Sequence, residues 1–270
     1  MSAQNEYHAV VHDRVQVERF AEMFTPIGED DVLLLFASFR RKYLHSNAET
    51  AHLVQTPCIS RTAITGVTPS KFYREVSRFQ VPVCCYVDRN ENPYPNGTMT
   101  VYCPLNPRSS VMAYEHLTGY FTSLFVKSSI KPEENQSVKN IVSVVKSGLQ
   151  KAIPKSLFYE LDIDTKDPVL LTKIHSVIKS QTRGTDAIVC IIETKNGFHV
   201  VFKCDKFSKY VKSAYGKVFM HSEWEFEDID SDGNYCTKRY VEIRTDAAPP
   251  VPGTFQAGFK VRFVESILPV

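Results

Sequence analysis

The chain has almost no excess of charge of either sign. Its 270 residues include 32 Lys and Arg against 30 Asp and Glu, which gives a formal net charge of +2. Such a balance creates no field over the whole surface, so any groove that attracts nucleic acid has to be local. The sequence also lacks a Gly-x-x-x-x-Gly-Lys phosphate loop and any Ser/His/Asp or Cys/His nucleophile signature. These absences argue against P-loop ATPases and against hydrolases.

Cysteine is present, but not in a pattern that binds metal. The seven cysteines are scattered, and no two have the Cys-x-x-Cys spacing that begins a zinc site. We therefore expect reduced, mostly buried thiols. No apolar run approaches the length of a membrane span, and the first residues resemble neither a signal peptide nor a transit peptide. We expect a soluble intracellular protein, in the cytoplasm or the nucleus, with no membrane partner.

What the chain does have is enough apolar material for a substantial core, since 43% of its residues are hydrophobic. Three segments differ in pattern. Residues 1–80 read as an N-terminal helical or accessory segment of short helices and loops. Residues 81–156 read as an α/β part, with two strands around a Pro/Gly/Asn-rich loop, a helix capped by Ser109 or Ser110, and a further helix over 138–149.

Residues 157–270 have the clearest pattern. The strand "SLFYELDI" is followed by a helix that begins at Asp167-Pro168, then by two strands joined through the turn dipeptide Asn196-Gly197. A helix after Asp205 and a final strand, either "RYVEIRT" or "FKVRFV", complete the order βαββαβ. This is the split βαβ arrangement of ferredoxin-like and RNA-recognition-motif folds. The predicted fold class is therefore α+β, with this RRM-like subdomain after an N-terminal α/β subdomain.

The first strand of that subdomain has three acids on one face. Alternation along a strand places Glu160, Asp162 and Asp164 together, and in this fold the end of the first strand meets the start of the third, where His199 lies. Carboxylates this close repel one another unless a cation neutralises them. Mg²⁺ or Mn²⁺ is the usual partner. The alternative interpretation is an exposed sheet edge whose acids are simply solvated.

Four segments together resemble the archaeo-eukaryotic primase superfamily, which includes primase-polymerases. "ELDID" looks like the metal-binding Asp-x-Asp/Glu strand of that superfamily, and "ETKNGFHVVF" is similar to its small-x-His motif, with His199 as the match. "DAAPPVPGTFQAGFKVRF" resembles the segment in which a third acid precedes a Pro-Gly-Thr stretch and a basic strand, and "LNPRSS" is similar to an N-terminal element of divergent members. The resemblance covers roughly residues 81–264. It implies that residues 81–156 are the N-terminal part of a catalytic module and that 157–270 are its palm with the metal site.

The resemblance also implies roles for individual residues. Asp162, Asp164 and Asp246 would hold two divalent ions, Mg²⁺ or Mn²⁺, that align a primer 3′-hydroxyl with the α-phosphate of an incoming nucleotide. His199 would contact the nucleotide phosphates, together with Lys260, Arg262 and Arg108. Glu242, inside "YVEIR", is the alternative third acid. Asp246 fits best if "FQAGFKVRF" is the strand beside the first one, and Glu242 if "RYVEIRT" is.

These roles predict a metal-dependent nucleotidyltransferase, a primase or primase-polymerase that acts on a single-stranded DNA template with nucleoside triphosphates. Without a zinc module or a helicase motif, initiation and unwinding would need an accessory subunit or a helicase partner, or the chain only extends primers. A glycosyltransferase of the Asp-x-Asp type is a second enzyme interpretation, but it leaves the Asn-Gly-x-His hairpin and the Pro-Gly-Thr segment without a role. A non-catalytic nucleic-acid-binding or scaffolding subunit of the same fold is the third.

Overall fold

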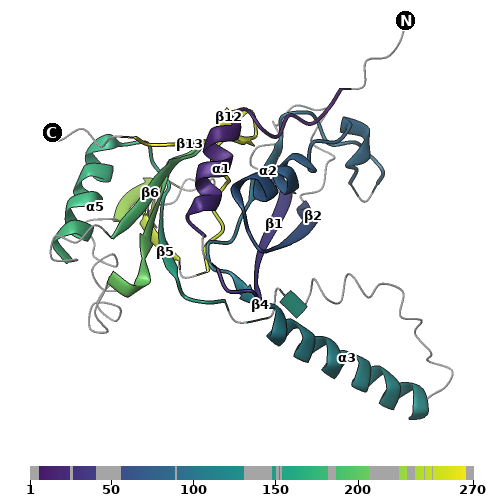
Figure 1. Cartoon of the computed structure of the whole chain (residues 1–270). Coiled ribbons are helices and arrows are strands. Elements are labelled where there is room, and N and C mark those ends of the chain that lie inside the picture. The colour runs from purple at the N-terminus through teal and green to yellow at the C-terminus, as the bar shows by residue number, and fades with distance from the viewer. Residues whose placement is uncertain are drawn as a thin grey trace, which may run out of the picture.

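The chain folds into a mixed α+β structure with two antiparallel sheets, as a computed structural model shows (Figure 1). A separate two-stranded pair is formed by β8 (Glu225–Ile229) and β9 (Tyr235–Arg239). The structure describes residues 6–24, 27–40, 56–88, 90–130, 148–149, 152, 154–181, 187–206, 225–229, 235–239, 241–244 and 246–265. The α+β class expected from the sequence is confirmed.

The first sheet combines strands from both ends of the chain. Its order is β12-β11-β3-β1-β2, with β4 also paired to β1. The strands are β1 (Asp31–Phe39), β2 (Thr56–Thr65), β3 (Met99–Tyr102), β4 (Arg108–Ser109), β11 (Phe255–Gln256) and β12 (Phe259–Lys260). Residues 1–80 are therefore not only short helices and loops. β1 was missed because its nearly continuous apolar run, "DVLLLFASF", has no alternation that marks a strand.

Two short helices pack on this sheet, and both begin at side-chain caps. α1 (Arg14–Glu22) starts after Asp13, whose carboxylate accepts from the backbone N–H of Gln16. α2 (Pro69–Ser77) starts after Thr68, whose hydroxyl accepts from the N–H of Lys71, and it has Pro at its first position. A cap of this kind satisfies N–H groups that a helix start leaves unpaired.

The second sheet carries the acids and the histidine of interest. Its order is β10-β5-β7-β6-β13, and each neighbouring pair is antiparallel. The strands are β5 (Phe158–Ile163), β6 (Ile188–Glu193), β7 (Phe198–Lys203), β10 (Val241–Arg244) and β13 (Arg262–Phe263). α5 (Pro168–Gln181) connects β5 to β6 and covers one face. It begins as expected at Asp167, whose carboxylate accepts from the N–H of Val169.

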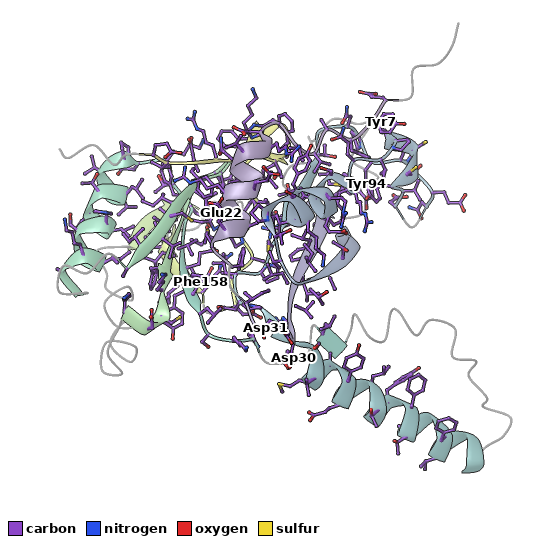
Figure 2. The ribbon with its side chains drawn as sticks, in the orientation of Figure 1. Tyr7, Glu22, Asp30, Asp31, Tyr94 and Phe158 are labelled. Carbon is purple, nitrogen blue, oxygen red and sulfur yellow. The ribbon has the colours of Figure 1, made fainter. Side chains whose placement is uncertain are left out.

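The other face of the second sheet packs toward α1 and the first sheet. One core cluster contains Phe24 and Leu33 of the first half together with Phe158 and Val201 of the second sheet. The rings of Phe24 and Phe158 meet edge to face with their centroids 6.0 Å apart, and Figure 2 labels Phe158 at the start of β5. The two sheets are thus joined by a shared apolar core.

Other elements agree with the expectations only in part. α3 (Ser110–Ile130) begins next to Ser109 as expected and extends away from both sheets (Figure 1). The first of the two strands expected around the Pro/Gly/Asn-rich loop is instead the 3-10 helix η2 (Val83–Cys85), whereas the second is β3. The helix expected after Asp205 and most of the one expected over 138–149 lie outside the described residues. No helix in the described part of the chain is long and apolar enough to cross a bilayer.

Candidate functional site

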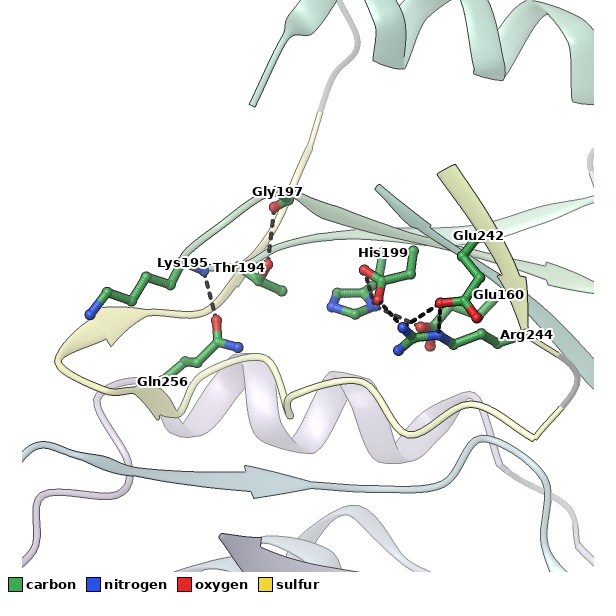
Figure 3. A network of polar contacts seen from close by, with 9 residues as sticks. Glu160, Thr194, Lys195, Gly197, His199, Glu242, Arg244 and Gln256 are labelled. Carbon is green, nitrogen blue, oxygen red and sulfur yellow. Dashed lines mark hydrogen bonds and ion pairs between the residues drawn. The ribbon is translucent and has the colours of Figure 1, made fainter. Parts of the chain in front are cut away.

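Three neighbouring strands place two acids and a histidine in one row across the sheet. In the register of β10, β5 and β7, Glu242 lies opposite Asp162, and Asp162 lies opposite His199. Glu160 lies two residues before Asp162, so both side chains point to the same face of β5. Leu161 and the other apolar residues of β5 that alternate with them pack under α5 instead. The acids and the imidazole therefore share the face that looks toward α1 and the first sheet (Figure 3).

The turn before β7 fixes this register. The backbone N–H of Thr194 donates to the carbonyl of Gly197 at 2.9 Å, which closes the hairpin between β6 and β7 as the Asn196-Gly197 dipeptide predicts. Gly197 also passes so close to β5 that a Cβ atom there would lie 1.7 Å from the carbonyl oxygen of Ile163. Only glycine allows β7 to approach β5 at this point, and the pairing of Asp162 with His199 depends on that approach.

A buried polar contact of the site joins His199 to Glu160. The Nδ1 atom of His199 lies 2.7 Å from Oε1 of Glu160, and both residues are buried. A carboxylate oxygen can only accept, so Nδ1 carries the proton in this bond. Burial by itself lowers the pKa of His199, but the charge and hydrogen bond of Glu160, together with Asp162 at 3.7 Å, outweigh it and raise the pKa. The imidazole is thus held toward its cationic form.

A second cation of the site is Arg244, which bridges two carboxylates. A terminal nitrogen of its guanidinium lies 2.8 Å from Oδ2 of Asp162 and 2.6 Å from Oε2 of Glu242. Its Nε atom donates to the same Glu242 oxygen at 2.9 Å (Figure 3). Burial raises the pKa of Asp162 above its ordinary value, although His199 and Arg244 oppose the shift. The attraction of Asp162 and Glu242 outweighs burial and raises the pKa of Arg244.

One oxygen of the site is buried without a partner. Oε2 of Glu160 has no hydrogen-bond donor among the residues that the structure describes, and the Glu160 side chain is only 1% exposed. A carboxylate oxygen without a donor is costly in the protein interior, because the group has lost its water. The position therefore favours an additional cation or donor beside Glu160.

Of the three acids expected to bind metal, only Asp162 lies within the row. Asp164 follows the end of β5 and is exposed. Asp246 comes after β10, and β10 runs antiparallel to β5, so the chain has moved away from Asp162 toward the start of β5 by that point. There Asp246 accepts from Arg108 at 2.5 Å. Of the two segments that could lie beside the first strand, "VEIR" forms β10 in that place and brings in Glu242, which is the alternative that did not favour Asp246.

The basic residues expected near the phosphates are distributed over other parts of the fold. Arg262 lies on β13 and pairs with Glu193 at 2.7 Å on the α5 side of the sheet, whereas Phe263 occupies the row of His199. Lys260 lies on β12 in the first sheet and is exposed. Arg108 is buried on β4, where it donates to the carbonyl of Ala152 and to Asp246.

Sequence reasoning singled out neither Arg244 as a member of the site nor Glu160 as the partner of His199. The alternation of side chains along a strand could have indicated part of the site, since it places Glu160 on one face with Asp162, and Glu242 on one face with Arg244. What the sequence lacked was the pairing of β10 with β5. Only that long-range contact places Arg244 against Asp162.

The donor set suits a hard divalent cation, because carboxylate oxygens are the ligands that Mg²⁺ and Mn²⁺ prefer and one buried oxygen lacks a partner within the described part of the chain. The side chains are not arranged as a finished cage. Within the described part of the chain, no three His, Cys, Asp or Glu residues converge as metal ligands, and Arg244 and His199 take the oxygens of the acids. In comparisons with known proteins, no family model, no curated protein and no solved structure matches this chain.

Proposed function

We propose that this chain is a metal-dependent nucleotidyltransferase of the primase or primase-polymerase kind, which makes or extends a primer on a single-stranded DNA template. The observation that carries the proposal is the row of Glu242, Asp162 and His199 across three adjacent strands. Acids for divalent ions and a cationic imidazole for phosphates, side by side on a rigid sheet, are what nucleotidyl transfer requires.

We also propose that the second sheet is an RRM-like palm. Counted along the chain from β5, its strands β10, β5, β7 and β6 are fourth, first, third and second, and neighbours are antiparallel. This is the order that the βαββαβ arrangement predicts. α5 supplies the first of its two helices, and the second would fall among residues 207–224, which lie outside the described part of the chain.

In this proposal Asp162 and Glu242 hold Mg²⁺ or Mn²⁺, with Asp164 as a further candidate ligand at the end of β5. An ion held there would supply the positive charge that nucleotidyl transfer needs in its transition state. Glu160 holds the Nδ1 atom of His199, which leaves the Nε2 atom as the one that would contact a phosphate oxygen. The chain positions its reactants and supplies charge rather than a nucleophile.

The proposal is tested by extension of a labelled primer on single-stranded DNA with Mg²⁺ or Mn²⁺. Asp162→Asn and His199→Gln should each lower incorporation by at least about a hundredfold, because they remove charge that stabilises the transition state. Glu265→Gln, which changes an exposed acid paired with Arg19, serves as the control. Incorporation by Asp162→Asn at the wild-type rate would overturn the assignment.

One observation favours a second candidate, a nucleic-acid-binding or scaffolding subunit without activity. Arg244 already neutralises two of the acids, as a protein that no longer binds metal could do. Such a subunit would bind single-stranded DNA without dependence on divalent ions, whereas the polymerase assignment predicts incorporation that chelation with EDTA abolishes.

A further inference from the structure

We propose that Arg244 is an exchangeable counter-cation: it neutralises Asp162 and Glu242 in the free protein, and it passes to the phosphates of the nucleotide when these carboxylates bind a divalent ion. The inference rests on the proposed function and adds to it a residue that couples metal binding to nucleotide binding.

The first step of the argument is competition for the same atoms. Arg244 uses Oδ2 of Asp162 and Oε2 of Glu242, at 2.8 and 2.6 Å. A hard divalent ion needs carboxylate oxygens at closer range, and it brings a larger charge to the same place. The guanidinium and the ion repel each other, so Asp162 and Glu242 cannot serve both at full strength.

The second step concerns the freedom of Arg244 to leave. β10 is the edge strand of its sheet, and 39% of the Arg244 side chain is exposed. The side-chain contacts of Arg244 with Asp162 and Glu242 are all made by the guanidinium, which a long and flexible side chain can move without disturbing the strand. The contrast with His199 is clear, because that ring is buried against Glu160 and has little freedom.

The third step is the local balance of charge. Three carboxylates, on Glu160, Asp162 and Glu242, face the imidazole of His199 and the guanidinium of Arg244. Among the described residues, the buried Oε2 of Glu160 has no partner, so these two groups do not satisfy every acceptor. A further cation would supply the missing partner, and Arg244 is the group that can move to admit it.

A released Arg244 would stand next to His199 on the same face of the sheet. Its planar fork suits bidentate contact with phosphate oxygens. The nucleotide triphosphate would then receive two cationic groups from neighbouring strands, one fixed and one supplied only after the carboxylates have bound metal. Arg244 is in this sense a positioning residue for the phosphates.

The experiment measures two affinities in wild type and in Arg244→Gln. Binding of Mn²⁺ alone, followed by electron paramagnetic resonance, should become at least about fivefold tighter in the variant, because a unit charge about 4 Å away has that effect even in water. Binding of a non-hydrolysable nucleoside triphosphate at saturating Mn²⁺ should become about tenfold weaker, since charge-assisted hydrogen bonds are lost. Arg244→Lys keeps the charge but lacks the planar fork of the guanidinium. Both of its affinities should therefore lie between those of wild type and those of Arg244→Gln.

In Arg244→Gln the affinity for Mn²⁺ should rise while the affinity for the nucleotide falls. These opposite changes distinguish the proposed role from a structural one, because a misfolded variant would lose both affinities. Arg78→Gln removes the same charge from an exposed arginine, which pairs with the buried Glu75 on α2, and should change neither affinity. Equal Mn²⁺ affinity in wild type and Arg244→Gln would overturn the exchange while leaving the metal site intact. Absence of Mn²⁺ binding in every variant, with or without nucleotide, would overturn both the exchange and the proposed function.

Discussion

His199 and Glu160 form a buried pair across β7 and β5, with Nδ1 and Oε1 2.7 Å apart. The pair links the chemistry of the site to the interior of the protein, because the carboxylate that orients the imidazole is itself nearly inaccessible to water. A buried acid with one satisfied and one unsatisfied oxygen has large effects on its neighbours.

Glu160→Gln should lower the pKa of His199, because it removes the nearest negative charge and leaves the desolvation of the ring in place. NMR titration of the imidazole measures this shift directly. Glu18→Gln, which changes an acid paired with Arg14 on α1, is the matched control and should leave the titration unchanged. If the titration of His199 in Glu160→Gln coincided with that of wild type, the imidazole would not depend on Glu160 for its charge.

Stability should fall as the pH rises through the titration of His199. The pKa of His199 is raised in the folded state, so its contribution is fully present below the unfolded value of about 6.5 and is lost as the pH passes the higher folded value. The raised pKa of Asp162 also makes stability fall as the pH rises, but this loss begins at lower pH, near the unfolded pKa of about 3.9. Urea unfolding of wild type and His199→Gln between pH 5 and 9 tests the first effect. The difference in unfolding free energy between the two proteins should shrink toward alkaline pH, and a constant difference would contradict the prediction.

Gly197→Ala should destabilise the protein by about 2–3 kcal/mol, as overpacking against rigid backbone does. The added methyl group would lie 1.7 Å from the carbonyl of Ile163, so β7 has to move away from β5. Gly119→Ala on α3 is the control, since nothing lies within 4 Å of the added carbon and alanine is the better helix former. Chemical denaturation should show loss of stability in the first variant and none in the second.

Asp246→Asn should lower mainly the stability of the protein, whereas Glu242→Gln should lower mainly its activity in primer extension. Asp246 is the carboxylate partner of the buried Arg108, so its change should cost about 1–3 kcal/mol of stability and little activity in primer extension. Glu242 is 63% exposed and lies opposite Asp162, so its change should reduce extension by at least about tenfold with little effect on unfolding. The reverse result would restore Asp246 as the third acid.

Local signals in the sequence were sufficient for the elements that local interactions determine. The Asn196-Gly197 hairpin and the helix that begins at Asp167 follow from turn and capping chemistry within a few residues. The pairing of Asp162 with His199 followed from the expected antiparallel order of β5 and β7. β1 escaped prediction because burial on both faces removes alternation.

The third acid required information that local sequence does not contain. "RYVEIRT" and "FQAGFKVRF" are both plausible last strands, and the choice depends on which one pairs with β5. The fold uses both, since "VEIR" forms β10 and the second segment is divided among β11, β12 and β13. Glu242 and Arg244 belong to the site because "VEIR", and not the second segment, pairs with β5.

The late position of β11 in the chain has a consequence for biosynthesis. Gln256 pairs with Thr100 on β3, and the backbone N–H of Phe255 donates to the carbonyl of Val10. A nascent chain that has not yet emerged beyond residue 256 leaves β3 as an open edge and the first residues without these partners. Completion of the first sheet therefore waits until residue 256 has left the ribosome, and until then the open edge of β3 can pair with other chains.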